Sequence, residues 1–526
     1  MKKPIFLVFF LTVISLSVFA QTQTSGGDNS GAYYDDSTVF VIREIEFIID
    51  GRTRPFALMA NGEFIEGQRI TGWENFQAYV ALKRQLLLNK RLLEEVNIEY
   101  FLGESSGVST PKEDGAVPVK LLVRVQDARN LVVFPLPQYS TSNGLKLGMR
   151  LRDYNFLGTM STLKFDFDYR QKDSDKSFNF SIESDTPFQA GGLIWSVRSN
   201  HFFDHTVGLP LFYQNVSGIS VQLPRRAASL TVGVNQYLTF NEEPGPESTL
   251  IYGVSDTYRP YGATELFVSR KIPIGKESGD FGQLAYTPRI AGKINYPTGD
   301  MDEPRKPSAT FSHSLEFGRI DWVGNYRRGL AASIDNSFDW YINRDDAPYR
   351  TIVDGNVTLH RIFTTFAGFS TRLRYRQWWQ RSDVMNDGSG GWIPYFDAGD
   401  VLRGVPDMSL WRNKESGLQA DRILSLNIDV PIKVLDFRPS VWLDSRKLRL
   451  FDFQLHFSPF FDAAMIQGPT NDFKPQEMIT TAGFEFIAFS GFFKNLQLRA
   501  SVGYNLGNFN GITKWDEIFV GTAFHY

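Results

Sequence analysis

Several things are missing from this sequence of 526 residues, and each absence excludes a class of protein. It has no cysteine, which excludes disulfides, thiolate metal sites and a lipid-modified N-terminal cysteine. After residue 20 it has no run of roughly 18 apolar residues, so no membrane-spanning helix is predicted. Its 55 basic residues nearly balance its 58 acidic ones, so nothing indicates nucleic acid as a partner. Its six histidines form no cluster, and no enzyme, cofactor or metal site is predicted.

The N-terminus has the pattern of a secretory signal peptide. Two lysines precede an apolar stretch, and Ala20 ends the segment with the small residue that cleavage needs. The alternative, a single membrane anchor, requires a longer apolar run. We therefore expect residues 1–20 to be removed and residues 21–38, which are polar and rich in glycine and serine, to form a flexible leader.

Aromatic residues are abundant: the chain contains 45 Phe, 21 Tyr and 10 Trp. An exported chain of this composition with no helical span fits a transmembrane β-barrel, whose sequence signal is alternation. In LQLRASVGYN (496–505) apolar residues alternate with polar residues or glycine, which predicts a strand between lipid and water. A soluble β-sandwich would also alternate, but its polar face would be outermost.

The last ten residues, EIFVGTAFHY, alternate in the same way. They resemble the C-terminal assembly signal of bacterial outer-membrane proteins, which ends on an aromatic residue. The resemblance assigns that signal to Gly521, Phe524 and Tyr526. It departs from the usual pattern at Phe519, where a polar residue is common.

A different pattern precedes the barrel. Residues 39–49 alternate as a strand, 53–60 form a short helical stretch, and 71–96 form a longer one with leucines at helical spacing. Two more strands are predicted at 97–102 and 117–125. An order of strand, helix, helix, strand, strand within about 90 residues is enough for a small α/β domain.

This block resembles a POTRA domain, the periplasmic module of the BamA/TamA family of outer-membrane assembly proteins. The landmarks are GRTRPFALMANGEFIEGQRIT, LLLNKRLLEEVNIEY and the closing VRVQD. RLRDYNFLGTMSTLKFDFDY (150–169) is similar to the family's first barrel hairpin. The resemblance implies one POTRA domain at 39–127 and an outer-membrane β-barrel at 131–526. A single POTRA departs from BamA itself, which usually carries several.

The fold class is therefore mainly β, with an antiparallel transmembrane barrel of 16 strands after one α/β domain. Sixteen strands at about 25 residues for each strand and loop would use up the remaining chain. Counting candidates yields about 18, so at least two are expected to be loop segments or extended hairpins. Residues 240–360 are ambiguous; the clearest candidates are 364–380, 420–433, 450–466, 478–489, 496–506 and 517–526.

The segment DVLRGVPD (400–407) places an arginine in a short apolar cluster. The resemblance implies a long extracellular loop, at about 381–421, that follows strand 11 and folds back into the barrel. Arg403 and Gly404 match the motif at its tip, although Val405 stands where an aromatic is usual. The alternative is an arginine in a solvated loop.

Partners for Arg403 can be sought by strand parity. In FDFQLHFSPFFD (451–462) alternation places Phe460 and Asp462 on the polar, lumenal face, as the family's Phe-x-Asp pair on strand 13 implies. Such a pair offers a guanidinium a ring and a carboxylate. On strand 12, Asn427 stands where the family usually has glutamate, so Asp429 on the same face could substitute.

The resemblance implies one of two activities, insertion of β-barrel proteins into the outer membrane or export of a partner polypeptide across it. The implied partners are unfolded outer-membrane or secreted polypeptides, outer-membrane lipid and accessory proteins that bind the periplasmic POTRA. Two alternatives stay open. One is a dedicated two-partner secretion pore, which usually has two POTRA domains and a plug helix. The other is a porin or adhesin that kept the architecture without the assembly role.

Overall fold

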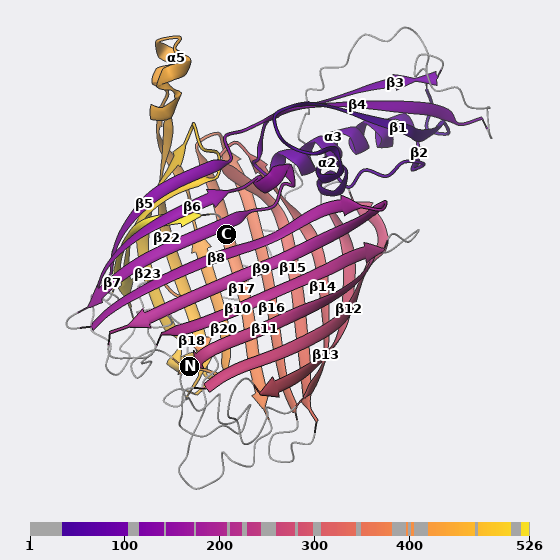
Figure 1. The fold of residues 1–526 in the computed structure, drawn as a ribbon. Helices are drawn as coiled ribbons and strands as arrows, with labels where there is room; N and C mark the ends of the chain where they lie inside the picture. The colour runs from indigo at the N-terminus through magenta and orange to yellow at the C-terminus, as the bar shows by residue number, and fades with distance from the viewer. Residues whose placement is uncertain are drawn as a thin grey trace, which may run out of the picture.

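The structure is a computed structural model, in which a small α/β unit precedes a large closed β-barrel (Figure 1). The predicted fold class is confirmed in both parts. No helix in the described part of the chain is long and apolar enough to cross a membrane. The predicted signal peptide lies outside the described residues, which are 34–103, 115–140, 144–172, 175–207, 211–223, 229–242, 259–278, 282–297, 307–342, 349–380, 396–397, 401–403, 419–468, 472–506 and 517–524.

The α/β unit packs two helices against one four-stranded sheet of order β2-β1-β4-β3, in which β1 and β4 are parallel. Its core is built on side chains with no exposed surface, among them Phe40, Phe76 and Leu121. Tyr34, at the end of the predicted leader, packs against Phe40 with ring centroids 5.4 Å apart. The elements are β1 (Val39–Asp50), α2 (Pro55–Asn61), β2 (Arg69–Thr71), α3 (Trp73–Asn89), β3 (Leu93–Leu102) and β4 (Val117–Asp127).

The long helix is shorter than predicted. The leucine spacing predicted a helix over 71–96, but α3 ends at Asn89. Arg91 has a φ of 56°, which stops the helix and turns the chain. Leu93 and Val96 are buried on β3. A bulge between Leu93 and Glu95 puts these two residues, three apart in the sequence, on the same face of the strand. The spacing therefore looked helical although it belongs to a strand.

The barrel is closed, and in the described residues it has 18 strand positions, so the predicted number of 16 is wrong. β20 and β21 lie end to end between β17 and β22 and share one position. The strands are β5 (Leu131–Ser140), β6 (Gly144–Asp153), β7 (Leu163–Lys172), β8 (Asp175–Ala190), β9 (Leu193–Thr206), β10 (Phe212–Leu223), β11 (Ser229–Glu242), β12 (Arg259–Ser278), β13 (Gly282–Pro297), β14 (Ser308–Val323), β15 (Tyr326–Tyr341), β16 (Tyr349–Thr364), β17 (Ala367–Gln380), β20 (Arg422–Asp429), β21 (Ile432–Phe437), β22 (Phe453–Gln467), β23 (Ile479–Ser490), β24 (Leu496–Asn505) and β25 (Glu517–Phe524).

Short connections explain the two additional strands. β8 and β9 are joined by Gly191 and Gly192 alone, and β14 and β15 by Gly324 and Asn325 alone. Two-residue turns of this kind leave more of the chain for strands than the assumed average did. The ambiguous region 240–360 accordingly holds five long strands, from β12 to most of β16.

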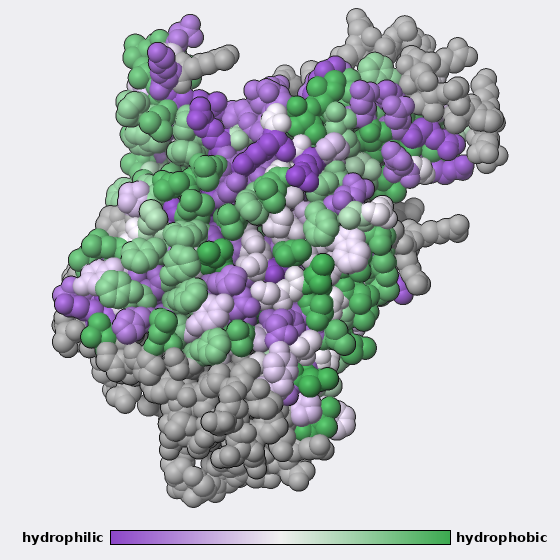
Figure 2. Space-filling model, in the orientation of Figure 1, coloured by the Kyte–Doolittle hydropathy of each residue, from purple (hydrophilic) through white to green (hydrophobic). Residues whose placement is uncertain are grey.

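The two faces of the barrel wall differ as a membrane barrel requires. On β6, Leu145, Leu147 and Met149 are exposed on the outside, whereas Arg150 and Arg152 are buried on the inside. Figure 2 shows hydrophobic residues gathered over the barrel strands on the visible face. The alternation is the one that lipid outside and water inside would select.

The α/β unit is attached to the barrel through the turn between β6 and β7. Asn155 is fully buried there and donates from Nδ2 to Thr53 Oγ1 (2.6 Å) and to Asp127 Oδ2 (3.2 Å). The Arg54 amide donates to the Gly158 carbonyl oxygen at 2.8 Å. The NFLG sequence, which suggested only a turn, therefore forms the joint between the two parts.

A second contact lies at the β14–β15 turn, far around the barrel from the first. Asn89 at the end of α3 donates to Asp321 Oδ1 (2.8 Å) and accepts from the Trp322 amide (3.0 Å). The Arg91 guanidinium stacks on the Trp322 ring, 4.4 Å from its centroid, and burial together with nearby Arg327 lowers the pKa of Arg91 to about 10. Held at both turns, the α/β unit lies across this end of the barrel (Figure 1).

Gly158→Ala tests the joint. Gly158 has a φ of 75°, and a Cβ there would overlap the Arg52 carbonyl oxygen. We expect the substitution to cost about 1–2 kcal/mol in backbone strain and to separate the two parts as well. Hydrogen exchange of the full-length protein should become faster at residues 51–55.

The matched control is Gly191→Ala, which has a φ of 59° at the same end of the barrel but no atom within 4 Å of the new Cβ. It carries the backbone strain without the overlap, so exchange at residues 51–55 should not change. Equal exchange in the two variants would mean that Gly158 serves the turn alone.

Candidate functional site

Arg403 lies inside the barrel, on a segment that connects β17 to β20. Of the predicted loop 381–421, the structure describes residues 396–397, 401–403 and 419–421. Gly404 lies outside the described residues. The loop follows the thirteenth strand position and not the eleventh, because the two additional strands precede it; five positions follow it, as predicted.

Asp462 on β22 holds Arg403 by three hydrogen bonds. Arg403 Nε donates to Asp462 Oδ2 at 2.9 Å, and Nη2 donates to Oδ1 at 2.6 Å. The Arg403 backbone amide donates to the same Oδ2 at 3.1 Å. The Asp462 side chain has no exposed surface, so its charge depends on these donors. The side-chain pair has the bidentate geometry that only arginine offers a carboxylate.

Three further groups surround the guanidinium. Arg403 Nη1 donates to Asp429 Oδ1 at 2.5 Å and lies 3.8 Å from Glu485 Oε1. The ring of Phe460 lies under it, with 3.8 Å between the guanidinium carbon and the ring centroid. The structure thus brings together four of the predicted residues: Arg403, Phe460, Asp462 and Asp429. On β20 the ion pair with Arg403 is made by Asp429 and not by Asn427.

Asn427 contacts the loop backbone and not the guanidinium. Its Nδ2 donates to the Val401 carbonyl oxygen at 2.9 Å. Val401 and Leu402 are buried and pack on inward-facing side chains of the wall, among them Ile423 and Ile466. The tip is therefore held by an apolar contact as well as by charge.

A glycine makes room for this arrangement. Gly483 on β23 is directly opposite Phe460 in the ladder. A Cβ at Gly483 would overlap the Phe460 ring and the Val502 carbonyl oxygen. The Phe460 ring can lie flat beneath Arg403 only because this position has no side chain.

Sequence reasoning missed two parts of the site. Glu485 was not predicted, although the alternation of GFEFIAF places it inward between outward phenylalanines. The apolar anchors Val401 and Leu402 carried no signal, because two apolar residues before an arginine occur in many loops. Among the predicted C-terminal signal residues, Gly521 and Phe524 lie in β25, whereas Tyr526 is outside the described residues.

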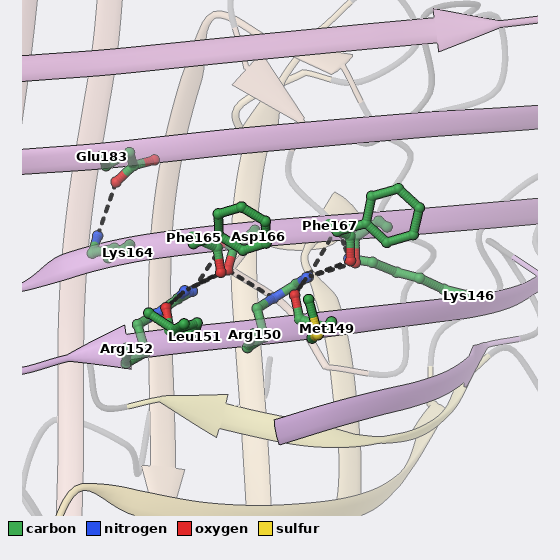
Figure 3. Close-up of polar contacts among 11 residues, drawn as sticks. Lys146, Met149, Arg150, Leu151, Arg152, Lys164, Phe165, Asp166, Phe167 and Glu183 are labelled. Atoms are coloured by element: carbon green, nitrogen blue, oxygen red, sulfur yellow. Dashed lines mark hydrogen bonds and ion pairs between the residues drawn. The ribbon is translucent and has the colours of Figure 1, made fainter. Parts of the chain in front are cut away.

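A second ion network lines the lumen near the first strand (Figure 3). Arg150 pairs with Asp168 at 2.7 Å and with Asp166 at 3.3 Å, and Arg152 also pairs with Asp166. Lys146 Nζ lies 3.1 Å from Asp168 Oδ2. These groups join β6 to β7 by side chains in addition to the backbone ladder, which stiffens the hairpin that holds the α/β unit.

Between the loop tip and the α/β unit the lumen holds a chamber of about 470 Å³. Leu402 and Arg403 line it from the loop, and Trp322, His360 and His456 line it from the barrel. Within the described ranges no group of histidine and acidic side chains is placed to hold a metal ion. The contacts around Arg403 fix the loop tip to the barrel wall.

No family model matches the sequence, and no curated protein matches it. Solved structures do resemble the chain. CdiB from Acinetobacter baumannii has a TM-score of 0.49 and 13% identity, over 92% of this chain and 73% of that one. CdiB from Escherichia coli has a TM-score of 0.49 and 11% identity, over 93% and 76%. BamA from Haemophilus ducreyi lacking POTRA domains 1–3 has a TM-score of 0.37 and 13% identity, over 92% and 85%.

Arg403→Ala should destabilise the barrel by about 3–5 kcal/mol, because it leaves the buried Asp462 carboxylate without its partner. Arg403→Lys should retain part of that stability, since an ammonium cannot make the bidentate pair. Thermal unfolding of the full-length protein in detergent measures both.

Lys474→Ala is the control, because Lys474 is an exposed cation that pairs with the equally exposed Asp472 between β22 and β23. Its unfolding temperature should match that of the unsubstituted protein. An Arg403→Ala variant as stable as this control would show that the cluster does not hold the loop.

Proposed function

We propose that this protein is an outer-membrane assembly or translocation factor, which inserts β-barrel proteins into the outer membrane or exports a partner polypeptide across it. The observation that carries the proposal is the contrast between a braced wall and a weak seam. The loop tip is fixed to β20 and β22 by the Arg403 cluster, whereas the described parts of the two closing strands share a single register pair.

That seam lies between the last strand and the first. Among the described residues, β25 and β5 share one register pair, Val520 with Tyr139. β24 and β25, by contrast, are paired at every residue from Leu496 with Phe524 to Gly503 with Glu517. An unpaired strand edge in lipid is costly, so a seam of this kind can exchange its partner for an incoming strand. This property favours a role in handling strands of other proteins.

The α/β unit supports the same role. β3 is an outer strand of its sheet, and Lys494 and Arg84 donate to the carbonyl oxygens of Leu93 and Val96 near its start. The part of β3 beyond Val96 can take up an extended polypeptide by strand addition. The unit lies across one end of the barrel, where a client from the periplasm would arrive. We accordingly propose that the α/β unit is a periplasmic POTRA domain and that the outward face of the barrel contacts outer-membrane lipid.

A disulfide across the seam tests the mechanism, and the absence of native cysteine makes the test clean. Tyr139→Cys combined with Val520→Cys should cross-link β5 to β25 under oxidation. If the seam opens during function, the oxidised protein should fail to complement a depleted strain and a reductant should restore it. Ile219→Cys with Val234→Cys, a register pair in a continuous ladder, should complement in both states.

Depletion identifies the client. The outer-membrane proteome and the culture supernatant are quantified after the protein is removed from its own bacterium. Loss of many barrel proteins would establish a general insertase, and loss of one secreted or surface protein would establish a dedicated transporter. Unchanged levels of both would contradict the proposal and favour a porin or an adhesin.

A further inference from the structure

An arm extends from the barrel wall where β21 turns back into β22. It consists of residues 437–453 and contains α5 (Pro439–Trp442) and η6 (Arg446–Phe451). The neighbouring β23 ends at Ser490, opposite Phe453, so the helical part of the arm lies beyond the ladder. Figure 1 shows it standing clear of the barrel at the same end as the α/β unit.

The arm exposes apolar side chains at its tip. Val441, Trp442 and Leu443 are 67%, 62% and 69% exposed, and Leu450 and Phe451 are exposed as well. The four residues of α5 include none that is buried. A cluster of this size at one tip indicates an interaction surface, since single exposed apolar residues are usually scattered.

The cluster is held in a fixed conformation. Asp452 accepts from the Ser440 amide at 3.0 Å and also from its hydroxyl group. The Phe437 ring contacts Trp442 edge to face (5.1 Å between centroids) and Phe453 (5.4 Å). The apolar surface is therefore preformed.

This surface is continuous with the outer face of the barrel. The register pairs Phe437 with Phe453 and Leu435 with Leu455 on the same outward face. Farther along β22, Phe457 packs against Phe484 and Phe486 of β23, at 5.8 and 5.3 Å between centroids. An unbroken outward apolar column thus runs from the wall to the tip, which favours lipid over a separate protein as its occupant.

The charges fit a phospholipid surface. Between residues 438 and 449 the sequence has four basic residues (Arg438, Arg446, Lys447 and Arg449) and one acidic residue, Asp444. Arg438 pairs with Asp436, and Arg449 pairs with Glu94 of β3, so the argument for lipid phosphate rests on Lys447. Tryptophan with basic residues around an apolar cluster is typical of segments that lie in the headgroup layer. Lys447 is exposed, as binding to a lipid phosphate requires.

We propose that the arm is an interfacial anchor that inserts Trp442 and Leu443 into the periplasmic leaflet of the outer membrane, with Lys447 at the phospholipid phosphates. The inference rests on the proposed membrane placement of the barrel and goes beyond it. The arm leaves the wall at β22, three strand positions from β25, and so fixes the bilayer level close to the seam.

Leu443→Cys carries the test, because the label then has one site in a chain without cysteine. The full-length protein is labelled with a fluorophore and reconstituted in vesicles of phosphatidylethanolamine and phosphatidylglycerol with brominated acyl chains. We expect bromine to quench the label to at least about half the extent seen at an acyl-chain position.

Two control sites bracket the result. Leu373→Cys, exposed on the outward face of β17, reports lipid, and Glu63→Cys, exposed on the α/β unit, reports water. If the label is quenched at Leu373 but the label at Leu443 is quenched no more than the one at Glu63, the arm is not an anchor. The placement of the barrel in the membrane would then still stand. If an unfolded outer-membrane protein then shifted the emission of the arm label, the surface would belong to polypeptide. Absence of quenching at Leu373 would contradict the membrane placement itself.

Discussion

The burial of one guanidinium is the constraint on which the lumen of this protein depends. An arginine inside a barrel is costly unless carboxylates and a ring surround it, and Asp462, Asp429, Glu485 and Phe460 do so from three adjacent strand positions. The converse also holds, because Asp462 has no exposed surface and would be an uncompensated charge without Arg403. The loop tip and the wall therefore stabilise each other.

The C-terminal part of the barrel contains both the braced wall and the seam. β20, β22 and β23 are joined by continuous ladders and by the charged cluster, while the described parts of β25 and β5 share one register pair. In a closed barrel every strand edge is satisfied, so any weakness must be concentrated at a particular pair of strands. Here it falls between the first and last strands of the barrel, which are brought together only when the barrel closes.

Local alternation was sufficient to predict what depends on strand parity. It placed Phe460 and Asp462 on the lumenal face, and it located the last five strand positions close to their observed bounds. The number of strands was predicted wrongly because it depends on loop length, which alternation does not encode. The role of Asn155 was missed for another reason: a buried amide that binds Thr53 across the chain looks like any other turn former. Glu485 was readable by parity, but without the loop tip nothing distinguished it from other inward polar residues.

The joint at Asn155 has a mechanical consequence. The turn that holds the α/β unit belongs to β6, and β6 is paired with β5 along its whole length, from Leu131 with Asp153 to Ser140 with Gly144. With the ion ladder between β6 and β7, these strands form a stiff plate. Because the α/β unit is also held at the β14–β15 turn, a force on it is divided between that side of the barrel and the strand next to β5.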